Sequence, residues 1–548
     1  MPGDWGLRFL RIIPRERRYG ISWPRMSRDV QCDICQMARV SGAPVTEPGS
    51  PFLLIPFATF NRTQSLDPDP SAPVQTKTQL GADLRYATTA LTFEGTYRPD
   101  FATADADVDP LQINSRFKVF YPERRPFFLE GMDLLSPVGA QRQFFSRSIQ
   151  NPLYGLKASG QASFASWTIL HAKDQDGGLI LDGNGASGLD GLPTRDTAAA
   201  MRFQLDSRGS GLSLLGTDKR LMGGPDRTGG QSGGLYLDQY LGSEFHFIGS
   251  VLAATSRLPQ ADGSVRSQRG TSTSAELDWS TRNWQAYAIS QATSPDLVLV
   301  SGFTDLQGYR RQNVGFGWRN NWNSGRLSQA NATVRWRNLD WWNGDPLERA
   351  AGLDLWMETA GRVSFFVNWD AFGRIWAEDH VHSVAERSLT VGGNLKRLSA
   401  VQFGWNATQG RTVDLASGDP ARLRSAQLFL NGTIHSVSYE LSALQVSLDR
   451  EADALRLVRA RELTASGSWQ LPHFFYLKTQ AFVVRYDGSE QEGVDKFLKG
   501  FLGWQPNAFT NAYVGWSGQR HRDPADVIPA ERMIERGLFA KVAYALQF

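Results

Sequence analysis

The stretch RGLFAKVAYALQF, residues 536–548, alternates apolar and other side chains along its whole length. One face carries Leu538, Ala540, Val542, Tyr544, Leu546 and Phe548. A repeat of two residues is the side-chain period of a β-strand. One apolar face opposite a mostly small or polar face is typical of a membrane β-barrel, but a half-buried strand of a soluble sheet alternates too. The stretch therefore predicts a strand and leaves two classes of sheet open.

The same alternation recurs upstream in many stretches. In residues 329–337, Ala330, Ala332, Val334 and Trp336 alternate with polar residues, and similar runs occupy 313–319, 363–371, 401–407 and 511–517. With their flanking residues these runs reach the roughly ten residues that a tilted membrane strand needs. Strands of soluble sandwiches usually have about 5–6 residues. The length favours a membrane barrel.

Composition agrees with a barrel and argues against other classes. The mean hydropathy of −0.34 is low, as expected when only every second residue of a strand faces lipid. No apolar stretch approaches the ~20 residues that a helix needs to cross a bilayer, so a helical membrane protein is excluded. The net charge of +3 is too small to indicate a nucleic-acid partner.

Short turns alternate with longer polar loops, as periplasmic turns and outer loops do in outer-membrane barrels. Ser207–Gly211 is one of the turns, and Asp174–Thr197 and Ser294–Tyr309 are two of the loops. With the C-terminal end placed in the periplasm, counting backwards gives about 24 strands, the first at Phe52–Phe60. We therefore predict an all-β fold, a large antiparallel transmembrane barrel over residues 51–548.

Residues 1–50 do not continue this pattern. They begin with arginines around short apolar pairs, without the apolar core of a signal peptide. Because an outer-membrane protein must be exported, we expect the sequence to begin inside a longer precursor. Cys32 and Cys35 form a single C-x-x-C, which supplies too few ligands for structural zinc and lacks a thioredoxin-like context. They are an incidental pair or a disulfide.

Residues 102–150 break the strand rhythm, between a strand at Leu91–Phe101 and one at Leu153–Gly160. A connection of about fifty residues in a compact barrel is normally functional. A barrel of about 22 strands or more has a lumen wide enough to need filling. We predict that this segment is a plug or an inward-folded loop.

Several motifs in and after this segment resemble one family. They are Asp105-x-Asp107, Asn114-x-Arg116-Phe117, the run YPERRPFFLEG at 121–131, Phe145-Ser146-Arg147 and Lys157-x-x-Gly160. Together they resemble the domain of unknown function family 5916, from about residue 50 onward. Asp105 stands where the family typically has Glu, and the C-x-x-C is not a family feature.

The resemblance implies a bacterial outer-membrane β-barrel. Members of the family are usually preceded by a periplasmic domain similar to carbohydrate-binding module family nine. On this resemblance, residues 1–50 are a truncated remnant of that domain plus a linker. The chain is expected in the bacterial cell outer membrane.

The candidate binding or plug residues are the polar and aromatic side chains of the irregular segment. They are Asp105, Asp107, Asn114, Arg116, Glu123, Arg124, Arg125, Phe127, Phe128, Glu130 and Arg147. Charges among aromatic residues are costly to bury unpaired. One interpretation is that they pair with opposite charges on the barrel wall and pin the segment. The other is a binding or gating constriction.

No metal or catalytic motif is complete. Asp105, Asp107 and Asp109 begin like a calcium loop, but Pro110 and Arg116 occupy the positions of its Gly and Glu, so only a looser cation site stays open. Residues 230–234 match G-x-S-x-G in letters but lack the strand–turn–helix context of an esterase. We expect no catalytic residue, metal or cofactor.

Inward-facing arginines and asparagines such as Arg319, Arg335 and Asn331 suit anionic or hydroxyl-rich solutes. The predicted role is passage or binding of a solute at the outer membrane, and the carbohydrate-binding-like domain that precedes the barrel in the family it resembles implies that the solute is glycan-related. Expected partners are outer-membrane lipid, the barrel-assembly machinery through the strand ending at Phe548, and a glycan. One alternative is a barrel-embedded hydrolase acting on lipid or glycan, which needs a nucleophile–base pair in the lumen. The other is a structural or secretion scaffold.

Overall fold

The computed structural model describes most of the chain. The described residues are 3–13, 19–25, 36–43, 51–66, 73–99, 114, 123, 125–129, 131–137, 139, 141–176, 192–222, 228–259, 264–322, 325–377, 382–398, 401–415, 417–489, 492–507, 509–522 and 532–547. Cys32 and Cys35 lie outside them.

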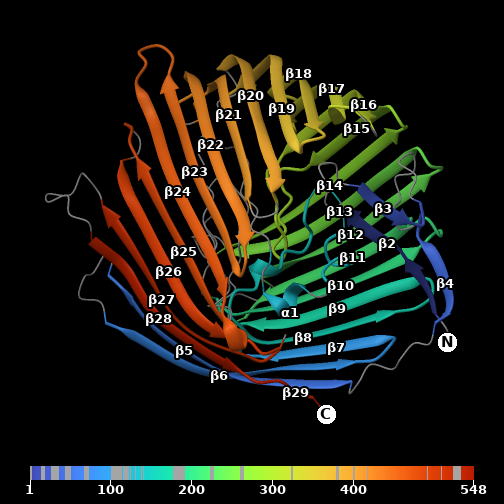
Figure 1. The fold of residues 1–548 in the computed structure, drawn as a ribbon, viewed down its shortest axis with the longest axis vertical. Coiled ribbons are helices and arrows are strands. Elements are labelled where there is room, and N and C mark those ends of the chain that lie inside the picture. The colour runs from blue at the N-terminus through green and yellow to red at the C-terminus, as the bar shows by residue number, and fades with distance from the viewer. Residues whose placement is uncertain are drawn as a thin grey trace.

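One antiparallel sheet closes on itself to form a barrel (Figure 1). Its strands are β5 (Phe52–Ser65), β6 (Gln75–Ala87), β7 (Leu91–Tyr97), β8 (Pro152–Gln161), β9 (Ala165–Asp174), β10 (Thr194–Gln204), β11 (Gly211–Leu221), β12 (Gly229–Leu241), β13 (Phe245–Pro259), β14 (Val265–Ser280), β15 (Trp284–Thr293), β16 (Tyr309–Asn321), β17 (Leu327–Trp341), β18 (Pro346–Thr359), β19 (Val363–Trp376), β20 (Ser383–Leu398), β21 (Val401–Val413), β22 (Pro420–Ile434), β23 (Val437–Arg450), β24 (Arg456–Gln470), β25 (Phe475–Tyr486), β26 (Gly493–Trp504), β27 (Asn511–Arg522), β28 (Arg532–Ala543) and β29 (Leu546–Gln547). Because β28 and β29 both pair with β5, we count them as one. The barrel formed by the described residues then has 24 strands, as predicted.

The alternation predicted for the last strand is present in β28. Leu538 and Val542 are 48% and 59% exposed, whereas Phe539 and Ala543 on the opposite face are 7% and 3% exposed. In a closed barrel the exposed face is the outside. The most exposed apolar side chains of other strands follow the same rule, among them Leu80, Val334, Phe372 and Leu463.

An apolar outer face of this extent is stable against lipid, and a closed barrel leaves no unpaired strand edge in a bilayer. The barrel is therefore a transmembrane barrel of the outer-membrane type. The helices are short: α1 (Pro126–Leu129), η2 (Ser146–Ser148) and η3 (Pro472–Phe474). None of the helices in the described ranges is both long and apolar enough to cross a membrane.

The connections differ at the two ends of the barrel. At the end where β28 and β29 finish, neighbouring strands are joined by brief connections, such as the one from Gln204 to Gly211. We call this the short-turn end and the opposite one the long-loop end. The prediction of a polar loop at Ser294–Tyr309 is wrong in one respect. Its run Leu297–Val300 is buried against apolar side chains of β13 that point into the lumen, because four successive apolar residues are more stable packed there than exposed to water.

Four short strands precede the barrel. β1 (Gly3–Leu7) pairs with β4 (Ala38–Ala43), and β2 (Phe9–Ile13) pairs with β3 (Tyr19–Trp23). They form two small sheets separate from the barrel sheet. The origin of residues 1–50 as the remnant of a carbohydrate-binding-like domain stays a prediction.

Candidate functional site in the barrel lumen

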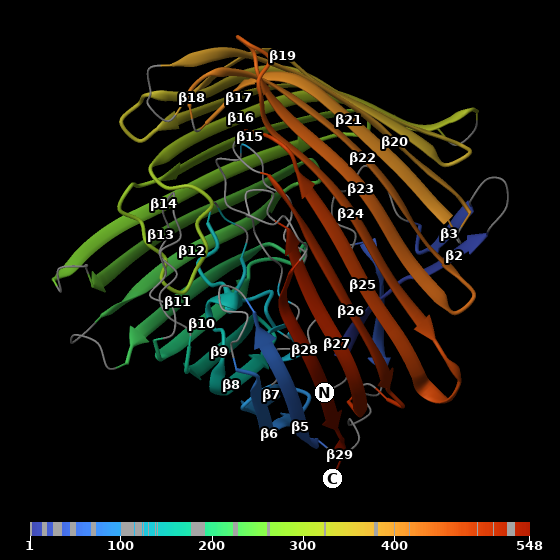
Figure 2. The same cartoon turned by 90° about the vertical axis from the view of Figure 1, so that its left-hand side faces the viewer.

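The described part of residues 123–151, here called the inward segment, lies inside the barrel. It leads into β8 from the long-loop end, and its helix α1 sits within the ring of strands (Figure 1). Figure 2 shows the same barrel from the side. Phe128, Leu135, Phe144 and Ile149 are buried together with side chains of β9 to β12. The neighbours of those wall residues, such as Ile169 and Leu214, are exposed outside. The inward segment therefore fills one side of the lumen.

Arg125 and Glu123 form the charged centre of the inward segment. Arg125 Nη2 lies 2.6 Å from Glu123 Oε2, and Arg125 Nε and backbone N–H each donate to Oε1 at 2.8 Å. The guanidinium also donates to the carbonyls of Ser146, at 2.7 Å, and Ile149. The Ser146 hydroxyl donates to Glu123 Oε2 at 2.5 Å. The pair thus ties the beginning of the segment to η2 near its end.

This environment fixes the charge of Glu123. Burial alone would raise the pKa of its carboxyl, but the hydrogen bonds and charge of Arg125, with the Ser146 hydroxyl, outweigh burial and lower the pKa to about 2. The Arg125 guanidinium also lies over the Phe128 ring, with Cζ 4.2 Å from the ring centroid. The ion pair is therefore present at neutral pH.

Two buried lysines of the barrel wall bind backbone carbonyls of the inward segment. Lys157 Nζ on β8 lies 2.7 Å from Glu94 Oε2 on β7 and donates to the Phe127 carbonyl at 2.7 Å. Lys219 Nζ on β11 lies 3.3 Å from Asp196 Oδ1 on β10 and donates to the Ser148 carbonyl at 2.8 Å. Each lysine therefore neutralises a wall carboxylate and holds the segment.

The end of the inward segment is held by wall acceptors and amides. Asp174, at the end of β9, accepts from the N–H groups of Gln150 and Asn151 at 2.6 and 2.8 Å. Gln143 donates to the Leu215 carbonyl at 2.9 Å and accepts from the Tyr236 hydroxyl at 2.8 Å. These hydrogen bonds between buried groups favour one docked position of the segment.

Gln141 connects the inward segment to the loop between β15 and β16. Its Nε2 donates to Asp305 Oδ1 at 3.1 Å and to the Tyr309 hydroxyl at 3.2 Å. Backbone groups of Arg142 and Phe303 exchange hydrogen bonds of 3.2 and 2.8 Å beside it. The two inward-folded stretches therefore support each other.

Asn114 contacts another part of the barrel wall. Its Nδ2 donates to the Val413 carbonyl at 2.7 Å, and its Oδ1 accepts from the Leu415 N–H at 2.8 Å. Val413 is the last residue of β21 and Leu415 lies in the connection from β21 to β22, far around the barrel from β8 to β12 (Figure 1). The predicted segment thus contacts the wall on two separated sides.

The structure brings together Glu123, Arg125, Phe127 and Phe128, and Arg147 lies in η2 near them. Asn114 is apart from this group. The remaining predicted residues, Asp105, Asp107, Arg116, Arg124 and Glu130, lie outside the described residues.

Glu123 and Arg125 pair with each other, whereas the first interpretation expected them to pair with opposite charges on the barrel wall. The wall instead presents Lys157, Lys219 and Asp174, which sequence reasoning missed as contacts. The sequence signal available for these contacts was a charged residue at a strand position that faces the lumen.

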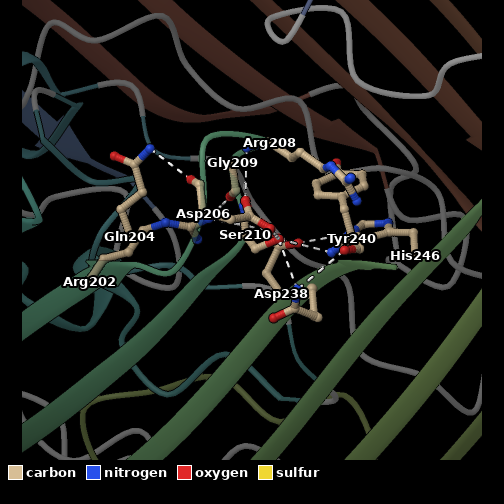
Figure 3. Close-up of polar contacts among 10 residues, drawn as sticks. Arg202, Gln204, Asp206, Arg208, Gly209, Ser210, Asp238, Tyr240 and His246 are labelled. Carbon is tan, nitrogen blue, oxygen red and sulfur yellow. Dashed lines mark hydrogen bonds and ion pairs between the residues drawn. The ribbon is translucent and has the colours of Figure 1, made fainter. Parts of the chain in front are cut away.

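A second polar network lies at the short-turn end of β10 to β13 (Figure 3). Asp206 accepts from the Ser210 hydroxyl at 2.7 Å and from the N–H groups of Arg208 and Ser210 at 2.8 and 3.1 Å. These bonds, the Ser210 hydroxyl first among them, lower the pKa of Asp206. The network fastens the turn between β10 and β11.

The histidine of this network binds a different carboxylate. His246 Nε2 lies 2.7 Å from Asp238 Oδ1, and the imidazole stacks on Tyr240 with ring centroids 4.2 Å apart. Ser210 bonds to Asp206, so the network does not form the serine–histidine contact that nucleophilic catalysis requires. A hydroxyl–imidazole pair, Thr197 with His171 at 2.9 Å, lies on the outer face. Within the described ranges, no group of three or more His, Cys, Asp or Glu side chains could hold a metal ion.

Comparisons with known proteins give one family match and several barrels. Residues 51–163 match the model of the domain of unknown function DUF5916. The chain matches no curated protein sequence. The FrpB iron transporter from Neisseria meningitidis is 11% identical, with a TM-score of 0.48, over 72% of this chain and 79% of that one. The alcaligin outer-membrane receptor FauA from Bordetella pertussis is 9% identical, with a TM-score of 0.43, over 75% and 91%. The copper transporter OprC is 7% identical, with a TM-score of 0.44, over 93% and 82%.

The matched residues 51–163 contain β5 to β8 and the whole inward segment. They include the motifs that resemble family 5916, so that recognition is confirmed. The chain is an outer-membrane β-barrel whose residues 51–163 match the DUF5916 family model.

Proposed function

We propose that the barrel passes polar solutes through its lumen and that the predicted segment 102–150 narrows the passage. The observation that carries this proposal is the anchoring of the segment on two separated parts of the wall. The inward segment binds β8, β9 and β11 through Lys157, Asp174 and Lys219, and Asn114 binds the end of β21 and the β21–β22 connection. Residues of one segment that are fixed at two separated parts of the wall would restrict the width of the passage.

A depression in the lumenal wall indicates which solutes fit. It has a volume of about 860 Å³ and is formed by β22 to β26. Its lining includes Glu440, Glu462, Thr464, Lys478, Gln480, Lys499 and Phe501. Leu463 lies between Glu462 and Thr464, and Leu498 precedes Lys499. Both leucines are exposed on the outer face, so the depression faces the lumen.

This lining supports the proposal that the solute is rich in hydroxyl groups, such as an oligosaccharide. Carboxylates, amides and hydroxyls supply hydrogen-bond partners of both kinds, and Phe501 supplies one apolar surface. A pocket with a few polar groups beside an aromatic ring is the usual composition of a small-molecule site. Whether the solute is an oligosaccharide is tested separately from whether the barrel passes solutes.

Conductance in planar bilayers tests the passage. The full chain is compared with a variant that lacks residues 102–150 and with a matched variant shortened in the β27–β28 connection. We expect the first deletion to raise single-channel conductance several-fold and the second to leave it unchanged. Heat-modifiable migration in gels checks that each barrel is folded. Equal and negligible conductance in the full chain and the first deletion would contradict the proposal.

Oligosaccharide block tests the solute. Maltohexaose added to the bilayer chamber should reduce the current of the full chain, whereas polyethylene glycol of the same mass should not. Glu462→Leu, which removes a carboxylate from the depression, should weaken the block. Equal reduction by both polymers would contradict a preference for hydroxyl-rich solutes but leave solute passage intact.

A further inference from the structure

A row of basic residues crosses the outer face of β9 to β13 near the long-loop end. The strand register places Lys173 opposite Arg195, Arg195 opposite Arg220, Arg220 opposite Gly229 and Gly229 opposite Arg257. Residues opposite each other on neighbouring strands share one face of a sheet. The four cations, here called the basic row, therefore lie side by side on one surface.

The basic row points away from the lumen. The residues that alternate with it, among them Asp196, Lys219 and Ser256, are buried on the lumenal side. Ile169 and Leu214 lie an even number of residues from Lys173 and Arg220 along the same strands, so they share the face of the row. Both are exposed on the outside. Arg195, Arg220 and Arg257 are themselves exposed. Their side chains thus reach the surroundings of the barrel.

Like charges directly opposite one another destabilise a sheet, so this arrangement suits an anionic ligand. Asp218 is the nearby acid: it lies 2.9 Å from Arg220 Nε and accepts from Gln231 at 2.8 Å. For Lys173, Arg195 and Arg257 the described part of the chain offers no carboxylate within ion-pair distance. The row therefore carries net positive charge.

The surface beside the row is hollowed. A depression of about 480 Å³ is lined by Arg220, Arg257 and Arg269 together with Asp218, Gln231 and Thr255. Arg269 adds a further cation, because it lies opposite Thr255 one row below. Guanidinium groups bind phosphate through paired, charge-assisted hydrogen bonds. The depression is therefore suited to a phosphate group.

The surface below the row suits acyl chains. Leu214, Leu235 and Val251 form an outward row that is 42%, 44% and 56% exposed. Between them and the basic row, Gly216 lies opposite Gly233, and a Cβ added at Gly233 would meet nothing within 4 Å. The outer face thus has cations, then a shallow recess, then an apolar belt.

We propose that the outer face of β9 to β14 binds an anionic lipid that carries more than one phosphate on its headgroup. The basic row extends over four strand spacings, about 20 Å, which is wider than a single phosphate. The acyl chains lie over the recess and the apolar belt, and the phosphates lie against the arginines. This site is separate from the lumen and does not depend on solute passage.

Lipid titration of the full chain in neutral detergent micelles tests the site. The probe is bisphosphorylated lipid A, compared with monophosphorylated lipid A, phosphatidylglycerol and inorganic phosphate, with binding followed by native mass spectrometry. The variant carries Arg195→Gln, Arg220→Gln and Arg257→Gln. Each cation near a lipid surface changes affinity about fivefold, so we expect the triple variant to bind bisphosphorylated lipid A about 100-fold more weakly.

A charge-matched control carries Arg208→Gln, Arg282→Gln and Arg326→Gln in turns at the short-turn end and should bind within about twofold of the original chain. Gly233→Leu fills the recess without changing charge and should weaken lipid binding while the barrel keeps its heat-modifiable migration. Equal losses in both triple variants would overturn the proposal, because the attraction would then be nonspecific. Inorganic phosphate binding as tightly as the lipid, or no preference for two phosphates, would also overturn it.

Discussion

Lys219 Nζ on β11 lies 3.3 Å from Asp196 Oδ1 on β10, and neither side chain has exposed surface. The same Nζ donates to the Ser148 carbonyl of the inward segment. Removing two charges from water costs several kcal/mol per ion, and only a close partner offsets that cost. The wall and the inward segment are therefore coupled through one ammonium group.

Lys219→Met removes that group and should destabilise the barrel strongly. Asp196 would be left as a buried charge without its cation, and breaking such pairs costs about 3–5 kcal/mol. Urea unfolding in lipid vesicles measures the loss. The double variant Lys219→Met with Asp196→Asn removes both charges and should recover most of the stability. Equal stability of the single and double variants would show that the pair is not coupled.

Arg125→Lys keeps the charge of the inward segment but should loosen the segment. An ammonium lacks the planar fork with which Arg125 reaches Glu123 and the Ser146 and Ile149 carbonyls together. We expect proteolysis within residues 123–151 to become about tenfold faster, corresponding to roughly 1.4 kcal/mol. Arg282→Lys, in an exposed turn, is the matched control and should leave the rate unchanged. An unchanged proteolysis rate in Arg125→Lys would contradict the role of the Arg125 guanidinium in holding the segment.

The barrel could be predicted from the sequence because a membrane strand must alternate at every step. Leu538, Phe539, Val542 and Ala543 face the sides that the alternation of residues 536–548 predicts, since lipid contacts one face and the lumen the other. The break in that rhythm marked residues 102–150 as the irregular part of the barrel sequence. Periodicity reports which face a residue occupies, and for the barrel that information is nearly sufficient.

The contacts of the inward segment could not be predicted in the same way. Lys157 and Lys219 bind the backbone carbonyls of Phe127 and Ser148, and a carbonyl has no signature in the sequence. Such contacts depend on how the segment folds back. The buried run Leu297–Val300 was missed because its loop was judged by overall polarity, although four successive apolar residues are a local signal for burial.

Asn114→Gly should free the β21–β22 connection from the predicted segment. Asn114 has a φ of 54°, so glycine keeps the backbone conformation and removes only the side chain. The Leu415 N–H loses its acceptor, and its hydrogen exchange should accelerate by roughly fivefold, as expected for about 1 kcal/mol per hydrogen bond. The β23–β24 connection, closed by Arg450 and Leu455, is the internal reference. Unchanged exchange at Leu415 would show that Asn114 does not hold this connection.

Glu123 should give the docked segment a defined acid sensitivity. Its pKa of about 2 lies below the ordinary value of 4.5, so its contribution to docking is complete above pH 4.5 and is lost as the pH falls towards 2. The shift corresponds to on the order of 3 kcal/mol. Bilayer conductance should therefore be constant near neutral pH and rise across that acid window as the segment is released. Glu123→Gln, neutral at every pH, should conduct more at neutral pH and lose this acid-induced rise. If the original chain and Glu123→Gln rise together in acid, another group controls the release, because the glutamine amide has no proton to gain there.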